Sequence, residues 1–162
     1  MDIFEFAMEK ERLSQEYYLE LKERTSNAGL STIFGMLADE ESKHREIVKR
    51  MKEQTAGDTV TETDVLANAR QVFNSMREAT DKFNLDVSEV ELYEKAQKIE
   101  AESRDFYLEK AEEVENPAHR EIFSKLAEEE KKHYYLLDNI IEFVLRPERW
   151  LENAEFFHPE PY

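Results

Sequence analysis

Two short segments of the chain each place a glutamate three residues before a histidine. Residues 37–44 read LADEESKH and residues 126–133 read LAEEEKKH. On an α-helix, residues three positions apart share a face, with their Cβ atoms about 5–6 Å apart. The carboxylate and imidazole of each segment can therefore hold one metal ion, and two such segments on facing helices can hold two.

These segments belong to a longer internal repeat. Residues 3–47 align with residues 92–136 at a constant offset of 89 and without gaps, with 17 identities in 45 positions. Outside the two short segments, the identical pairs include Glu11 and Glu100, Tyr18 and Tyr107, and Asn27 and Asn116. A helical hairpin repeated after a long connection predicts a four-helix bundle, an architecture that builds metal sites from facing core side chains.

Apolar residues recur at helical spacing through both hairpins, which we expect over residues 2–55 and 88–146. The first hairpin turns near Asn27. The second turns at Asn116-Pro117, where proline suits the first turn of a helix. Ser88 and Glu91 have the spacing of a capping box, which predicts the start of the third bundle helix.

The connection between the hairpins, residues 56–87, is too long for a turn. Its apolar residues predict a crossover that contains a helix from about 62 to 83. The bundle then forms one domain over residues 1–146. The remaining segment, 147–162, carries Trp150 and Phe156, and we expect it to pack on the bundle or on a partner subunit.

Composition excludes several classes of function. The chain has 38 acidic against 22 basic residues and a formal net charge of −16, which opposes binding to nucleic acid or to anionic lipid. It has no cysteine, so any metal must be bound by Glu, Asp and His. No basic and apolar leader opens the sequence, and no apolar run approaches the ~20 residues that span a bilayer. We expect a cytoplasmic protein with no membrane association.

Ligands on antiparallel helices must lie equally far from the turn that joins them. Glu11 and Glu41 are equidistant from Ser26, and the corresponding pair in the second hairpin is equidistant from residue 115. At ~1.5 Å per residue, each ligand lies about 22 Å from its turn. The candidate ligands are four glutamates and two histidines: Glu11, Glu41, His44, Glu100, Glu130 and His133. Carboxylate oxygens with imidazoles suit iron or manganese.

The same spacing also arises by accident, because the chain is rich in glutamate. Residues 155–158 read EFFH, but they lie outside the repeat and precede Pro159. The repeated copies differ because they lie on core-facing stripes, where burying several carboxylates without a cation would be costly. The alternatives for them are a solvated charged face or a decayed duplicate.

The chain resembles the rubrerythrin branch of the ferritin-like superfamily over residues 3–145. The resemblance rests on the four spaced pairs Glu11-x6-Tyr18, Glu41-x-x-His44, Glu100-x6-Tyr107 and Glu130-x-x-His133. It implies an all-α, ferritin-like four-helix bundle that holds two iron ions, with manganese as an alternative. In that family pattern Glu41 and Glu130 bridge the metals.

The resemblance also assigns the remaining ligands. Glu11 with His44 would hold one metal, and Glu100 with His133 would hold the other. Two further glutamates precede the bridging pair and would accept a hydrogen bond from the histidine of the opposite hairpin: Glu40 and Glu129. The repeated tyrosines lie two helical turns from a ligand, a position from which their hydroxyls can bond ligand carboxylates: Tyr18 and Tyr107.

Two departures from rubrerythrin proper follow from the residues. The chain has no cysteine and so contains no rubredoxin domain, which makes a separate protein the electron donor. Ser103 stands where rubrerythrins have an extra carboxylate. We expect a di-iron redox protein that reduces hydrogen peroxide or dioxygen, assembled as a homodimer or larger homo-oligomer. The alternatives are non-catalytic iron binding, storage or delivery, and a metal-free helical interaction module.

Overall fold

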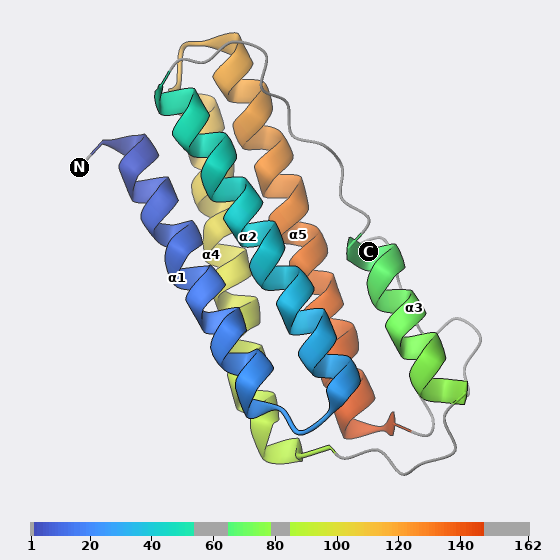
Figure 1. Cartoon of the computed structure of the whole chain (residues 1–162). Helices are drawn as coiled ribbons and strands as arrows, with labels where there is room; N and C mark the ends of the chain where they lie inside the picture. The colour runs from blue at the N-terminus through green and yellow to red at the C-terminus, as the bar shows by residue number, and fades with distance from the viewer. Residues whose placement is uncertain (1, 54–64, 79–84, 148–162) are drawn as a thin grey trace.

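All the regular structure in the described part of the chain is helical (Figure 1). The computed structural model describes residues 2–53, 65–78 and 85–147. In chain order the elements are α1 (Ile3–Arg24), α2 (Ala28–Lys52), α3 (Val65–Glu78), a 3₁₀ turn (Val87–Glu89), α4 (Val90–Glu113) and α5 (Pro117–Leu145). The expected all-α, ferritin-like bundle is confirmed, with α1, α2, α4 and α5 as its four long helices.

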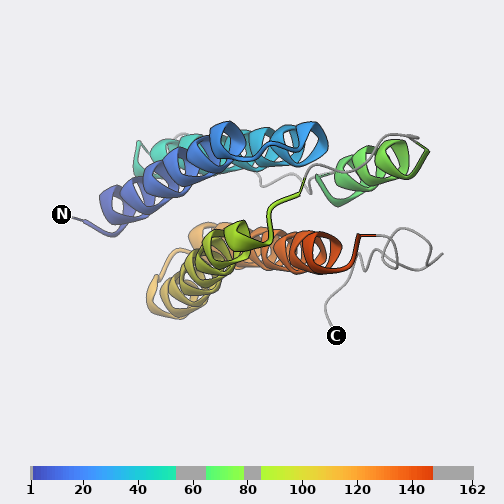
Figure 2. The same cartoon turned by 90° about the horizontal axis from the view of Figure 1, so that it is seen from below.

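The bundle consists of two layers, each an antiparallel hairpin. Seen from below, α1 and α2 form one layer and α4 and α5 the other (Figure 2). The α1–α2 turn lies at one end of the bundle and the α4–α5 turn at the opposite end (Figure 1). The hairpins therefore run head to tail, and each helix of one layer faces an antiparallel helix of the other.

An asparagine side chain begins the second helix of each hairpin. The Asn27 Oδ1 atom accepts a hydrogen bond from the Leu30 backbone N–H at 2.9 Å. The Asn116 Oδ1 atom accepts from the N–H groups of Ala118 at 2.9 Å and His119 at 3.4 Å. Asparagine stabilises a helix start because it satisfies backbone donors that have no partner within the helix.

The prediction of a capping box formed by Ser88 and Glu91 is wrong. Asp86 instead accepts hydrogen bonds from both the backbone N–H and the hydroxyl of Ser88, at 2.9 and 2.6 Å. Those bonds close a 3₁₀ turn, and α4 begins after it at Val90. An aspartate two residues earlier competes successfully for the same donors because its short carboxylate reaches N–H groups at turns.

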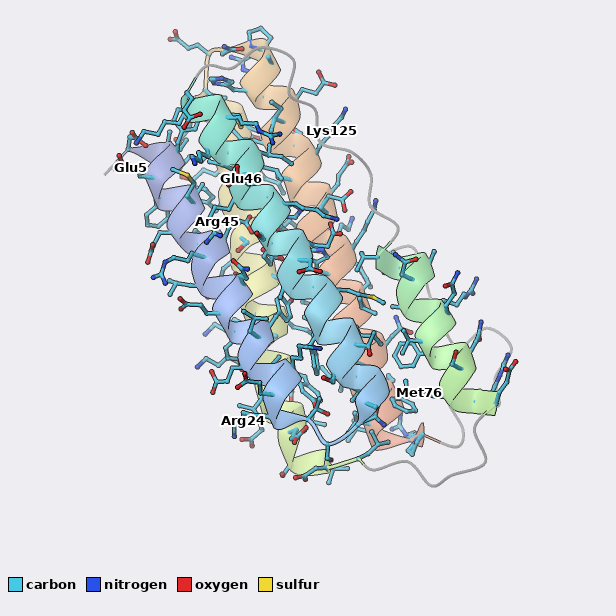
Figure 3. All side chains as sticks on the ribbon, viewed as in Figure 1. Glu5, Arg24, Arg45, Glu46, Met76 and Lys125 are labelled. Atoms are coloured by element: carbon cyan, nitrogen blue, oxygen red, sulfur yellow. The ribbon has the colours of Figure 1, made fainter. Side chains whose placement is uncertain are left out.

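Helix α3, within the crossover, packs on the outside of the bundle beside α2 and α5. Its buried residues are Val65, Leu66, Ala69 and Phe73. Phe73 meets Phe143 of α5 edge to face, with ring centroids 5.4 Å apart. Met76, labelled in Figure 3, lies against Gly29, where an added Cβ would stand 2.6 Å from its sulfur. Glycine at position 29 thus allows α3 to approach α2 closely.

The rest of the crossover, 54–64 and 79–84, and the terminal segment 148–162 lie outside the described residues. The expected docking of that segment and the accidental EFFH motif at 155–158 both fall there. Among the described helices, none combines the length and the apolar character that crossing a membrane requires.

Two apolar clusters fill the bundle, one toward each end. The larger lies near the α1–α2 turn and includes Leu30, Phe34 and Leu137, together with the buried face of α3. The smaller lies near the α4–α5 turn and includes Val48, Phe123 and Leu126. Between them, all four long helices present buried polar side chains. The apolar clusters therefore enclose a polar layer at mid-height.

Candidate metal centre

The structure brings all six candidate ligands together in this polar layer. They form two groups whose ligand atoms lie within 4.8 Å of one another. One group is Glu11, Glu41, His44 and Glu130, and the other is Glu41, Glu100, Glu130 and His133. No ligand residue is more than 2 % exposed. Glu41 and Glu130 belong to both groups.

The helices supply these side chains unequally. In each hairpin the first helix contributes one glutamate and the second contributes a glutamate and a histidine. On α1, Glu11 lies on the same buried stripe as Ala7, Ser14 and Tyr18. Spacings of three and four residues keep all four on the face that meets the other helices. The same pattern that forms the apolar core thus directs the ligands inward.

Each histidine reaches across to the other hairpin. The Nδ1 atom of His44 lies 2.7 Å from Glu130 Oε1, and the Nδ1 atom of His133 lies 2.8 Å from Glu41 Oε1. The two imidazole rings are almost parallel, with centroids 5.7 Å apart and planes at 6°. Both rings therefore present Nδ1 to a carboxylate of the other hairpin.

The two tyrosines also connect the hairpins. The Tyr18 hydroxyl on α1 donates a hydrogen bond to Glu100 Oε1 on α4. The Tyr107 hydroxyl on α4 donates to Glu11 Oε1 on α1, at 2.5 Å. Each tyrosine thus bonds the glutamate of the opposite helix, and that glutamate's second oxygen is buried without a hydrogen-bond partner among the described residues.

Seven buried atoms have no hydrogen-bond partner in the described part of the chain. Six belong to the ligand residues, namely one oxygen of each glutamate and the Nε2 atom of each histidine, and the seventh is Glu40 Oε2. Buried polar groups are almost always satisfied, because an unpaired one costs about 1–3 kcal/mol. Four inward carboxylates with one unpaired oxygen each fit the donor set of a metal centre.

The four ligand carboxylates differ in how readily they ionise. Burial and the neighbouring carboxylates hold the pKa of Glu41 and of Glu130 well above the usual range. Burial alone would raise the pKa of Glu100, but the charge of His133 and hydrogen bonds from neighbouring side chains lower it to about 2. The pKa of Glu11 is lowered in the same way, against burial, by Glu41, His44 and Tyr107. Full ionisation of the cluster therefore requires added positive charge.

Glu40 and Glu129 lie immediately outside the six ligands. The Glu40 carboxylate is 3.4 Å from the Lys43 amine, and the Glu129 carboxylate is 3.1 Å from the Lys132 amine. The hydrogen bond expected from each to the histidine of the opposite hairpin is not formed, because the Nε2 atoms of both histidines have no partner among the described residues. Sequence reasoning missed the two lysines, although the repeat contains both at identical positions.

A four-helix bundle with a buried site of four glutamates and two histidines defines a class, the ferritin-like carboxylate proteins. Within that class the sequence pattern of the Rubrerythrin family matches residues 2–141, and the chain belongs to this family. The structure is similar to that of a hypothetical protein from Pyrococcus furiosus, with a TM-score of 0.66. That likeness covers 89 % of each chain at 22 % identity and supports the fold alone. No curated protein matches the chain.

Proposed function

We propose that this protein is a non-haem di-iron redox protein that reduces hydrogen peroxide or dioxygen with electrons from a separate donor protein. The observation that carries the proposal is the pair of overlapping ligand groups, in which every glutamate keeps one buried oxygen without a partner. A group of carboxylates and imidazoles of this composition suits iron, and manganese accepts the same ligands.

In this proposal Glu41 and Glu130 lie between the two metals, since each belongs to both groups. Glu11 with His44 completes one position, and Glu100 with His133 completes the other. When bound, the two irons would supply the electrons that reduce the oxidant and would recover them from the donor.

The remaining residues position the ligands and control protons. The hydroxyls of Tyr18 and Tyr107 hold Glu100 and Glu11 from outside the site. The apolar clusters on either side exclude water, which strengthens electrostatic interactions within the layer. Glu41 and Glu130, with raised pKa values, take up protons whenever positive charge leaves the site and release them when it returns.

Metal analysis combined with optical spectra tests this function. Protein from iron-supplemented cells should contain about two irons per chain. Its near-ultraviolet absorption should bleach on anaerobic reduction and return when peroxide is added. Iron that binds but is not reoxidised by peroxide would favour iron storage or delivery. Protein without metal would contradict both and leave a helical interaction module.

A further inference from the structure

Each hairpin carries a lysine–glutamate ion pair at the edge of the metal centre. Lys43 pairs with Glu40 at 3.4 Å, and Lys132 pairs with Glu129 at 3.1 Å. The two pairs occupy identical positions of the internal repeat. Within each pair the glutamate directly precedes the one shared by both ligand groups. The pairs are therefore a repeated part of the site's surroundings.

The glutamates of these pairs are buried. Their side chains are only 9 % exposed for Glu40 and 3 % exposed for Glu129. A carboxylate withdrawn from water is stable only when nearby charge or hydrogen bonds compensate for the lost solvation. On the solvent side, the lysine ammonium provides that compensation.

On the inner side, these carboxylates border the candidate ligands. Glu40 and Glu129 each directly precede a glutamate that belongs to both ligand groups. The Oε2 atom of Glu40 is buried without a hydrogen-bond partner among the described residues. The charge of each lysine–glutamate pair therefore lies beside the metal centre.

Formal charges show which metal state the pairs favour. Four ligand carboxylates balance two divalent ions, and the two outer glutamates are balanced by the two lysines. Oxidation of both metals adds positive charge that the site does not balance. Loss of a lysine would leave one uncompensated carboxylate, which would stabilise the oxidised, more positive state.

We propose that Lys132, and to a smaller extent Lys43, raise the reduction potential of the metal centre by compensating the charge of Glu129 and Glu40. Both are positioning residues that act through a neighbouring carboxylate. The inference rests on the proposed function, because it concerns a metal centre that changes oxidation state.

The two lysines differ in exposure, which sets the order of their effects. The Lys132 side chain is 26 % exposed and its ion pair is shorter, whereas the Lys43 side chain is 69 % exposed. Water and salt screen exposed charges far more than partly buried ones. Lys132 therefore has the larger influence.

The experiment compares Lys132→Gln and Lys43→Gln with two controls in the full-length, iron-loaded protein. Lys132→Arg keeps the charge, and Lys49→Gln removes an exposed charge from the same helix as Lys43. After equal iron content is verified, the midpoint potential is measured by redox titration. For Lys132→Gln we expect the ratio of oxidised to reduced centre at a fixed potential to rise about tenfold, or 59 mV per one-electron step. Lys43→Gln should shift less, and both controls should match the wild type.

A second readout needs no redox chemistry. The affinity of metal-free protein for Zn²⁺, measured against a chelator, should increase about tenfold in Lys132→Gln, because a more negative site attracts a divalent ion. If Lys132→Gln matches Lys49→Gln in both potential and Zn²⁺ affinity, the inference is overturned. If wild-type protein binds Zn²⁺ but shows no reversible iron redox cycle, the proposed function fails, and an unchanged Zn²⁺ affinity in Lys132→Gln would then overturn the inference separately.

Discussion

The two hairpins of this bundle present the same candidate ligands in different surroundings. Glu11, Glu41 and His44 in the first correspond by the repeat to Glu100, Glu130 and His133 in the second. Around them the halves differ at the seam between α1 and α4. At one end Phe6 packs on Phe106, with ring centroids 5.3 Å apart. At the other end, the repeat places Lys95 and Tyr17 at the positions that correspond to Phe6 and Phe106. There the Lys95 amine lies 5.6 Å from the centroid of the Tyr17 ring.

The ends of the bundle differ as well. Helix α3 joins only the apolar cluster near the α1–α2 turn, where Phe73 contacts Phe143. The cluster near the α4–α5 turn contains the contact between Tyr107 and Phe123 instead. The six candidate ligands are identical between the halves, whereas some of the residues that pack around them, such as Phe6 and its counterpart Lys95, differ. The comparison therefore shows where the two halves of the repeat can differ without a change in the candidate ligands.

The largest effect should come from the two glutamates shared by both ligand groups. Glu41→Ala and Glu130→Ala each remove a ligand from both positions and should leave little bound iron, whereas Glu11→Ala and Glu100→Ala should keep about one ion per chain. Elemental analysis of protein from iron-supplemented cells measures this. Full iron content in Glu41→Ala would contradict the sharing of this residue.

The next effect concerns the two apolar clusters. Phe34→Ala and Phe123→Ala, at related positions, should each lower the free energy of unfolding by about 3–5 kcal/mol, because both rings are fully buried. Urea denaturation of metal-free protein measures the change. As a control, Phe6→Ala replaces a ring that is 46 % exposed and packs on Phe106, and it should lower the free energy of unfolding by only about 1 kcal/mol. Equal losses in all three variants would refute this view of the packing.

The tyrosine bonds should matter less than the cores but equally in both halves. Tyr18→Phe and Tyr107→Phe each remove a hydroxyl that bonds a buried carboxylate and should cost about 1.5–3 kcal/mol in the metal-free protein. Chemical denaturation gives the values. A loss in only one of the two variants would show that the halves are not equivalent at the site.

The smallest effect should come from the helix caps. Asn27→Ala and Asn116→Ala should each cost about 1 kcal/mol, with the larger loss at the buried Asn27. The two turns lie at opposite ends of the bundle (Figure 1), so the double variant should show the sum of both losses. Thermal unfolding monitored by circular dichroism tests this, and a markedly non-additive double variant would speak against independent turns.

The helices, both turns and the grouping of the six candidate ligands could be predicted from the sequence because each depends on local spacing or on the repeat. Asparagine marks both turns, and the equal distances of Glu11 and Glu41 from the first turn place them at the same height in the bundle. The start of α4 could not be predicted, because Ser88 could be bonded by either Asp86 or Glu91, and only the backbone path decides between them.

Contacts between the hairpins could not be predicted from spacing. The bond from Tyr18 to Glu100 depends on the relative height of α1 and α4, which no single turn determines. The docking of α3 depends on Gly29, whose lack of a side chain admits Met76. The lysine–glutamate pairs were visible in the repeat, but their role depends on burial, which the sequence does not give.

The most direct test of the account is a crystal structure of the iron-loaded protein with anomalous scattering measured at the iron edge. We predict two iron peaks between the apolar clusters, one bonded to His44 and the other to His133, with Glu41 and Glu130 in contact with both. A single iron peak, or iron bound away from Glu41 and Glu130, would contradict the account.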